Sequence, residues 1–119
     1  MKIKITNLDK EFSYYIRTKA NWTCERCKKR YDPPTRALHC SHFYGRRKKS
    51  VRWCVDNVSA HCYACHRYFG EHPKEFTDWM RKKLGGKRFG LLVRKANTIK
   101  RWTPKELDEL LRYYEKKNE

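Results

Sequence analysis

Two Cys-x-x-Cys pairs constrain the fold of this chain more than any other feature of its sequence. The first pair is Cys24 and Cys27, and the second is Cys62 and Cys65, after an intervening segment of residues 28–61. A Cys-x-x-Cys turn directs two thiolates at one centre, and two such turns complete a tetrahedral zinc site. Because four thiolates leave no open position on the metal, the sequence predicts a structural zinc ion that clamps the two ends of the segment together.

Composition supports a metal-stabilised fold and a polyanionic partner. The chain has 119 residues, of which 39% are hydrophobic and 36% charged, so its apolar core must be modest. Its 30 Lys and Arg against 13 Asp and Glu give a formal net charge of +17, which resists compaction unless an anion offsets it. Nucleic acid is the first candidate partner. An anionic membrane is the second, but the sequence contains no long apolar span that would anchor one.

The N-terminal sequence MKIKITNLDKEF lacks the apolar segment of a secretory signal. We therefore expect a cytoplasmic protein, in the host-cell cytoplasm if a phage encodes it, where six cysteines favour metal ligation over disulfides. This expectation disfavours a second interpretation of residues 62–66 (CYACH), the C-x-x-C-H pattern that attaches c-type haem. Covalent haem attachment follows export, and a haem protein would not need the second Cys-x-x-Cys pair.

Helical patterns lie on both sides of the cysteine-bounded segment. Residues 8–20 carry one apolar helical face. Pro73 suits the first position of a helix that Gly85-Gly86 should end, and a basic, weakly structured section should follow. A capping box of Thr103 and Glu106 then begins a last helix. The three apolar faces consist of Leu8, Phe12, Tyr15 and Ile16, of Phe76, Trp79, Met80 and Leu84, and of Leu107, Leu110, Leu111 and Tyr114.

The segment between the cysteine pairs is expected to form a hairpin. Residues 38–44 and 51–54 are the two predicted strands, joined by the charged loop 46–49. Asp56-Asn57 then turns the chain toward residues 62–66, which should open a short helix. Cys40 and Cys54, which also lie in this segment, are expected to be free thiols that face a small core.

Histidines gather in and just after this segment, at positions 39, 42, 61 and 66. A hairpin and a helix clamped by zinc can bring a strand histidine and a helix-start histidine to one water-filled cleft. One neutral imidazole can then take a proton from water, while another holds a divalent cation that neutralises charge on a phosphate and on the departing 3′ oxygen. This constellation is the one that a metal-dependent phosphodiesterase needs.

The run LHCSHFYGRRKKSVRWCVDNVSAHCYACHRYFGEHPKEF resembles the HNH, or ββα-metal, nucleases. Within them it is most similar to the phage NinG-type recombination nucleases, with phage endonuclease VII a more distant relative. A C-x-x-C, a strand ending in His-aromatic, a basic loop with S-V-R-aromatic, a D-N turn and a final H-C-x-x-C-H carry the resemblance, in this order. The resemblance covers about residues 24–80.

The resemblance implies an α+β fold, with a small zinc-stabilised ββα-metal (HNH) core and flanking N- and C-terminal helices. We divide the chain into an N-terminal helix (1–23), a nuclease core (24–84) and a basic C-terminal helical arm (85–119). The implied activity is metal-dependent hydrolysis of DNA to 5′-phosphate and 3′-hydroxyl ends, on branched or single-strand-containing recombination intermediates. A homodimer stays open, because related junction-cutting nucleases often work as dimers.

The resemblance also implies roles for three residues. His42 takes the position of the general base, and His66 that of a ligand of the catalytic metal. Asn57 takes the middle position, where its amide ties the loop to the hairpin and orients the histidine. Mg²⁺ or Mn²⁺ is the expected ion, although histidine and phosphate ligands also accept nickel or zinc.

The second protein ligand of that metal has two candidates. Many HNH proteins have an acidic residue or a histidine immediately before the base, but this chain has Ser41 there. His39 shares the strand face of Ser41, because side chains two apart point the same way. His72, six residues beyond His66, occupies a place where relatives often have Asn or His, and it is the preferred candidate.

Each of these residues also has a plainer interpretation. His42 could pack between layers, and His39 and His61 could be structural or contact phosphate. His72 could cap the helix that Pro73 opens, and an Asp-Asn turn is ordinary by itself. On these interpretations the protein is a non-catalytic zinc-finger module that binds DNA.

Basic residues are expected along the phosphate backbone of DNA, where contacts give affinity without sequence and depend steeply on salt. The predicted contacts are Arg46, Arg47, Lys48, Lys49, Arg52, Arg67 and the section 81–101. Arg46, Arg47 and Arg52, together with a nearby dication, should also keep His42 neutral. Since no segment resembles a base-reading helix, we expect selectivity for the structure of the DNA and not for its sequence.

Overall fold

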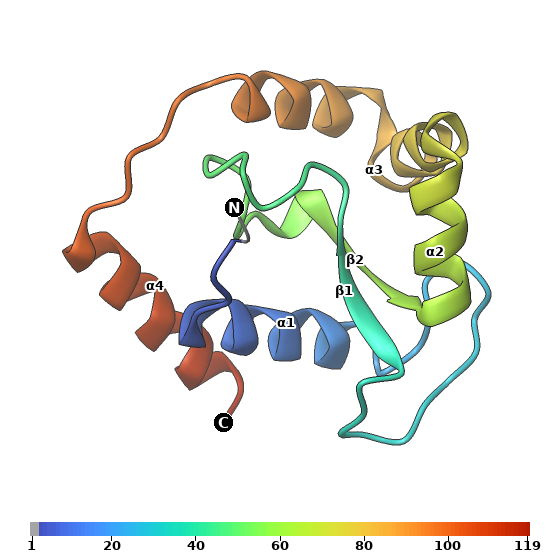
Figure 1. Ribbon diagram of the computed structural model, residues 1–119, viewed down its shortest axis with the longest axis horizontal. Coiled ribbons are helices and arrows are strands. Elements are labelled where there is room, and N and C mark those ends of the chain that lie inside the picture. Colours follow the sequence, from blue (N-terminus) through green and yellow to red (C-terminus); the bar gives the residue numbers. More distant parts are fainter. Residues whose placement is uncertain (1–2) are drawn as a thin grey trace.

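A two-stranded antiparallel hairpin lies at the centre of this α+β fold, and helices surround it (Figure 1). The computed structural model describes residues 3–119. Strand β1 (Leu38–His42) pairs with β2 (Val58–Cys62), with Leu38 opposite Cys62 and His42 opposite Val58. The cysteine-bounded segment therefore does contain a hairpin, although β1 ends two residues before the predicted boundary.

Both faces of β2 are covered, so that all five of its residues are buried. Val58 packs on one face with Phe12 and Ile16 of helix α1 (Asn7–Lys19). On the other face, His61 contacts aromatic rings of α2 (Tyr63–Glu71) and α3 (Pro73–Ala96), namely Phe69, Phe76 and Trp79. The hairpin is thus the middle layer between α1 and the pair α2–α3.

The terminal helices form where local sequence signals predict them. Helix α1 begins with a capping box in which Thr6 and Asp9 exchange hydrogen bonds. Helix α4 (Pro104–Lys117) begins with the predicted capping box at Thr103. The two helices pack through Tyr114, whose ring meets that of Phe12 edge-on at 5.1 Å between centroids.

The predicted return strand at residues 51–54 is wrong. These residues form turns, in which the N–H groups of Val51 and Cys54 donate to the carbonyl oxygens of Lys48 and Val51. A short 3-10 turn, η1 (Val55–Asn57), then leads into β2, the true return strand. Its sequence VSAHC alternates apolar and polar residues, but all five are buried, and only Val58 is of a type enriched in strands.

The predicted end of the third helix at Gly85-Gly86 is only half correct. Gly85 has φ 81° and ψ 161°, a conformation that favours glycine, and it breaks the helix there. The chain then resumes the helix as far as Ala96, so the section predicted to be weakly structured is helical over most of its length. Phe89, Leu92 and Ala96 pack on Val51, which gives this second part of α3 its stability.

A buried ion pair joins α1 to the loop after β1. Arg52 donates from Nη2 to Asp9 Oδ2 at 2.6 Å and from Nε to Oδ1 at 3.0 Å. Trp53 Nε1 donates to Asp9 Oδ1 at 3.1 Å, and the Thr6 N–H to Oδ2 at 2.8 Å. Burial alone would raise the pKa of Asp9, but the hydrogen bonds from Arg52 and Thr6 hold it below its usual value. Arg52 is only 8% exposed, so it is not available for the DNA contact predicted from the sequence.

Replacement of Asp9 tests this pair. Asp9→Ala leaves the Arg52 guanidinium buried without a carboxylate, and we expect it to lower the free energy of unfolding by about 3–5 kcal/mol. Asp108→Ala is the control, because it breaks an exposed pair with Arg112 on α4 and should cost less than about 1 kcal/mol. Urea unfolding measures both values, and equal losses in the two variants would contradict a structural role for the buried pair.

Candidate metal centre and histidine cavity

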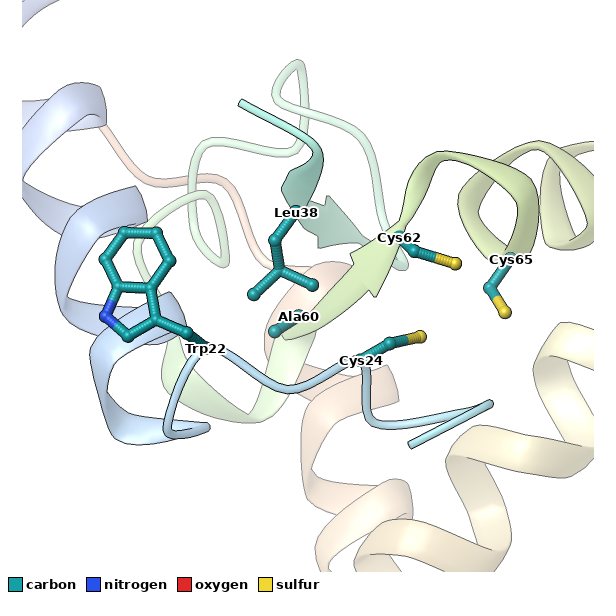
Figure 2. Close-up of a cluster of buried hydrophobic side chains, with 6 residues drawn as sticks. All are labelled: Trp22, Cys24, Leu38, Ala60, Cys62 and Cys65. Atoms are coloured by element: carbon teal, nitrogen blue, oxygen red, sulfur yellow. The ribbon is translucent and has the colours of Figure 1, made fainter. Parts of the chain in front are cut away.

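The four cysteines of the two Cys-x-x-Cys pairs meet, as the sequence predicts. Their sulfur atoms all lie within 4.8 Å of one another. In Figure 2, the side chains of Cys24, Cys62 and Cys65 point their sulfurs toward a common space beside the end of β2. The sulfurs of Cys27 and Cys62 are 3.8 Å apart. A regular tetrahedron with zinc–sulfur bonds of about 2.3 Å has edges of about 3.8 Å, so the donor set fits zinc.

The first cysteine turn is docked on the outer edge of β2 through Glu25. The Glu25 N–H donates to the carbonyl oxygen of Ala60 at 2.8 Å, and the Glu25 carboxylate accepts from the Ala60 N–H at 2.6 Å. Lys28, with φ 69°, lets the chain turn back beside Cys24. Burial raises the pKa of the Cys24 thiol, but backbone N–H groups, first that of Cys27, lower it to about 7. Such a thiol gives up its proton readily to a metal.

Arg26 supports the same centre from outside the sulfur cluster. Its guanidinium donates to Cys65 Sγ at 3.5 Å and lies over the ring of Tyr68, with Cζ 4.1 Å from the centroid. A positive charge beside the sulfurs offsets part of the excess negative charge that four thiolates leave on a zinc site. Arg26 therefore orients and balances the ligands in the way that outer-shell partners do.

Cys40 and Cys54 lie outside the cluster, as expected. Cys40 packs beside the buried side chains of α1, and burial raises the pKa of its thiol to about 12. Cys54 packs against the cluster that contains Val51 and Met80. Both are free thiols.

A cavity of about 700 Å³ lies along β1, between α1 and α2, and we name it the histidine cavity. Its lining includes His39 and His42 of β1 and His66 of α2. It also includes three arginines, Arg17, Arg36 and Arg46. Among the described residues, no carboxylate lines it. The basic groups of this cavity are thus three imidazoles and three guanidiniums, without a carboxylate beside them in its described lining.

His42 has one occupied and one unoccupied ring nitrogen. Nε2 lies 2.9 Å from the carbonyl oxygen of Arg52, and since a carbonyl only accepts, Nε2 carries the proton. Nδ1 then holds a lone pair, and it is buried without a hydrogen-bond partner within residues 3–119. Burial first, and then the charge of Arg46, lower the pKa of His42 to about 4. The imidazole is therefore neutral at pH 7, as the arginine-rich surroundings led us to expect.

His66 and His39 lie face to face at the α2 side of the cavity. Their rings are stacked, with centroids 5.2 Å apart and planes 3° from parallel. His66 Nδ1 is 3.1 Å from the hydroxyl of Ser41, which is buried and fixes the ring. Burial, and then the charge of the neighbouring histidine or of Arg17, lower the pKa of both imidazoles. Neutral imidazoles oriented by a second group are typical metal ligands.

The structure does not bring His72 to this cavity. Its exposed ring stacks on Tyr68 at 4.1 Å between centroids, and Nδ1 lies 2.8 Å from the Tyr68 carbonyl oxygen. His72 does occupy the N-cap position of α3, but its side chain makes no capping hydrogen bond. The residue beside His66 is His39, so the order of preference given by the sequence for the second ligand is reversed.

The side chain of Asn57 joins the two ends of the loop that follows β1. Its amide nitrogen donates to the carbonyl oxygens of Tyr44 at 2.9 Å and Val51 at 3.1 Å, and its Oδ1 accepts from the Tyr44 N–H at 2.8 Å. Asn57 is fully buried. These bonds match the loop-tying part of its predicted role. His61 is also fully buried, and burial lowers its pKa to about 3, in accord with a structural interpretation.

The predicted DNA-contacting residues have different surroundings. Arg46 lines the histidine cavity, and Arg47 and Lys48 line an adjoining cavity of about 500 Å³. Lys49 is exposed in the same loop, and its carbonyl oxygen accepts from Trp102 Nε1. Arg67 is exposed and paired with Glu71.

Part of the basic section 81–101 is used within the fold. Lys83 donates to Ser59 Oγ at 2.7 Å and pairs with Glu25 at 2.9 Å, and Arg88 pairs with Asp56. The charges of Lys83 and Arg88 are thus partly neutralised by the protein itself.

Sequence reasoning missed Arg17 and Arg36. Neither lies in a run of charges, and their place in the cavity depends on the packing of α1 beside β1. The only sequence signal is the position of Arg17 next to Ile16 in the apolar face of α1.

No protein-family model matches this chain, and neither the curated proteins nor the solved structures contain a match. Within residues 3–119, no helix combines the length and the hydrophobicity that crossing a membrane requires.

Zinc content tests the metal centre. Emission spectroscopy should find about one zinc ion per chain. Cys65→Ser should lose most of the zinc and unfold at a lower temperature, because zinc contributes about 10 kcal/mol or more to folding at such sites. Cys54→Ala, which changes a cysteine outside the cluster, should keep the full zinc content. Equal zinc content in the two variants would contradict the assignment.

The protonation state of His42 can be followed by NMR. With a pKa of about 4, its ring signals should stay constant from about pH 7.5 to about pH 5.5, whereas in urea-unfolded protein they should titrate near pH 6.5. The folded pKa is depressed, so the unfolded chain binds the extra proton between the two values. The contribution of His42 to stability is therefore complete above about pH 6.5 and falls as the pH drops toward 4. A midpoint near 6.5 in the folded protein would contradict burial of a neutral ring.

Proposed function

We propose that this protein is a metal-dependent DNA endonuclease with an HNH-type (ββα-metal) core, similar to the phage NinG-type nucleases. The observation that carries the proposal is one cavity lined by His42, His39 and His66 together with three arginines. A hydrolase of phosphodiesters needs a neutral base, ligands for a cation and positive charge for the phosphate. The residues of the histidine cavity can supply all three.

His42 is the proposed general base. The Arg52 carbonyl holds the proton on Nε2, so Nδ1 carries the lone pair that takes a proton from the attacking water, which has to reach this buried atom from the cavity. A pKa of about 4 would make a weak base at pH 7. The negative charge of a bound phosphate opposes the effect of Arg46 and raises this pKa toward the working range. Substrate binding thus strengthens the base at the moment when it is needed.

His66 and His39 are the proposed protein ligands of the catalytic metal. Ser41 fixes the Nδ1 side of His66, which leaves Nε2 as its donor. A divalent cation bound there supplies neutralisation of charge on the phosphate and on the departing 3′ oxygen. Two imidazoles together with phosphate oxygens form a mixed donor set, which suits Mg²⁺ or Mn²⁺ as well as nickel or zinc.

DNA is the proposed substrate because the chain carries a formal net charge of +17 and the loop 46–49 is largely exposed beside the cavity. Branched or single-strand-containing recombination intermediates are the proposed class of DNA, on the strength of the sequence resemblance. The same basic loop also favours the alternative function, a zinc-finger module that binds DNA without cutting it.

One assay separates the two functions. The zinc-loaded protein is incubated with supercoiled and with branched DNA, without added metal and with Mg²⁺, Mn²⁺, Ni²⁺ or Zn²⁺. We expect cleavage that requires the added metal, and His42→Ala should lower its rate by about 100-fold or more while DNA binding is kept. His72→Ala is the matched control and should cleave normally, since His72 lies away from the cavity. Wild-type protein that binds DNA and cuts it with none of these ions would establish the alternative.

A further inference from the structure

The histidine cavity has an excess of positive charge that the protein does not neutralise. Of the three arginines that line it, Arg46 alone lies within 4.0 Å of a carboxylate among residues 3–119. That carboxylate belongs to Asp9, which is already paired with Arg52. Within residues 3–119, Arg17 and Arg36 form no ion pair. The cavity wall therefore carries guanidinium charges that can bind an anion.

Arg17 is fixed in place by groups that do not cancel its charge. Its Nε donates to the carbonyl oxygen of Ser13 at 3.2 Å, and its Nη1 donates to that of Thr35 at 2.8 Å. The guanidinium carbon also lies 4.9 Å from the centroid of the Trp22 ring. A guanidinium has five N–H groups, so these two bonds leave most of its donors for a ligand.

The bond to Thr35 also brings the neighbouring Arg36 to the cavity. Arg17 belongs to α1, whereas Arg36 belongs to the segment that enters β1, so the two guanidiniums reach the cavity from different parts of the chain. Arg36 is exposed and makes no hydrogen bond within residues 3–119, which leaves it able to adapt to a ligand. One fixed and one adjustable guanidinium suit the planar, bidentate recognition of phosphate oxygens.

We propose that Arg17 and Arg36 form an anion clamp that holds a backbone phosphate of DNA in the histidine cavity, before any divalent cation binds there. This inference rests on the proposed function, because it places that phosphate beside His42 and His66. The uncompensated guanidiniums repel a dication from an empty cavity, and a bound phosphate reverses this effect and adds oxygen ligands. Phosphate and cation therefore strengthen the binding of each other, by the same factor in both directions.

The clamp can be tested by binding alone, without catalysis. Fluorescence anisotropy measures the affinity of zinc-loaded protein for a short single-stranded oligodeoxynucleotide, in buffer without added Mg²⁺ or Mn²⁺ and without chelator. We expect Arg17→Gln and Arg36→Gln each to weaken binding by about tenfold, because each removes charged hydrogen bonds to phosphate. The slope of log affinity against log salt should also fall by about 0.7 for each lost phosphate contact on a single strand.

Two controls separate a clamp from general electrostatics and from misfolding. Arg30→Gln removes the same charge from an exposed arginine outside the cavity and should change the affinity less than about twofold. Arg17→Gln also loses its bonds to Ser13 and Thr35, so its zinc content and unfolding midpoint are compared with those of the wild type. Arg36→Gln has no such bonds to lose and is the cleaner variant.

A direct readout is the NMR signal of the Arg17 Nε–H group, which should shift when inorganic phosphate is titrated into the metal-free cavity. Arg17→Gln and Arg36→Gln proteins that bind the oligodeoxynucleotide as Arg30→Gln does would overturn the clamp. If the clamp variants lose binding and the wild-type protein does not cut DNA with any of the added metal ions, the clamp stands and the nuclease function fails. If the wild type cuts and both variants bind normally, the nuclease function stands and the clamp fails.

Discussion

The carboxylate of Asp9 is the interaction on which the arrangement of this molecule depends. It accepts hydrogen bonds from Arg52, Trp53 and Thr6, and it is buried in a chain that otherwise carries a large excess of positive charge. Arg52, held by its side chain, presents its carbonyl oxygen to Nε2 of His42. The tautomer of the proposed base is therefore set through two contacts by a residue of the N-terminal helix. Since α1 also provides Arg17, this helix is a wall of the proposed site and not an appendage to it.

The cysteine cluster plays the complementary role on the opposite side of the hairpin. Cys62 is the last residue of β2 and also the N-cap residue of α2, so no linker separates the sheet from the helix. The start of the helix is thereby fixed by the same thiolates that fix the first cysteine turn. Because His66 follows Cys65 in α2, its backbone is placed by the same cluster, and Ser41 of β1 determines the orientation of its ring. His42 and His66 are thus positioned by groups that lie outside the proposed reaction, the carbonyl of Arg52 and the hydroxyl of Ser41.

Local signals allowed part of this structure to be predicted from the sequence. The apolar helical face of residues 8–20, the capping box at Thr103 and the spacing within each cysteine pair act over a few residues, and each led to the correct element or cluster. Predictions that depended on distant packing were less successful. Strand β2 was missed because VSAHC has one β-branched residue of strand type and no large aromatic residue, whereas residues 51–54 (VRWC) have the composition of a strand but are held in turns by the loop.

Three further differences have the same kind of cause. The helix after Gly85 is stabilised because Phe89 and Leu92 pack against the side chain of Val51, which is distant in the sequence. Arg52 looked like part of a basic surface because Asp9, its partner, precedes it by 43 residues. His39, and not His72, stands beside His66, because the pairing of strand and helix decides which ring reaches the cavity.

The direct succession of Cys65 and His66 in α2 has a consequence for how such chains can vary. A residue inserted between the two would rotate the imidazole by about 100° around the helix axis and advance it by about 1.5 Å, away from Ser41. Such an insertion would keep Cys65 in the sulfur cluster but would move the imidazole of His66 out of the histidine cavity. The direct adjacency of Cys65 and His66 therefore couples the geometry of the sulfur cluster to that of the histidine cavity.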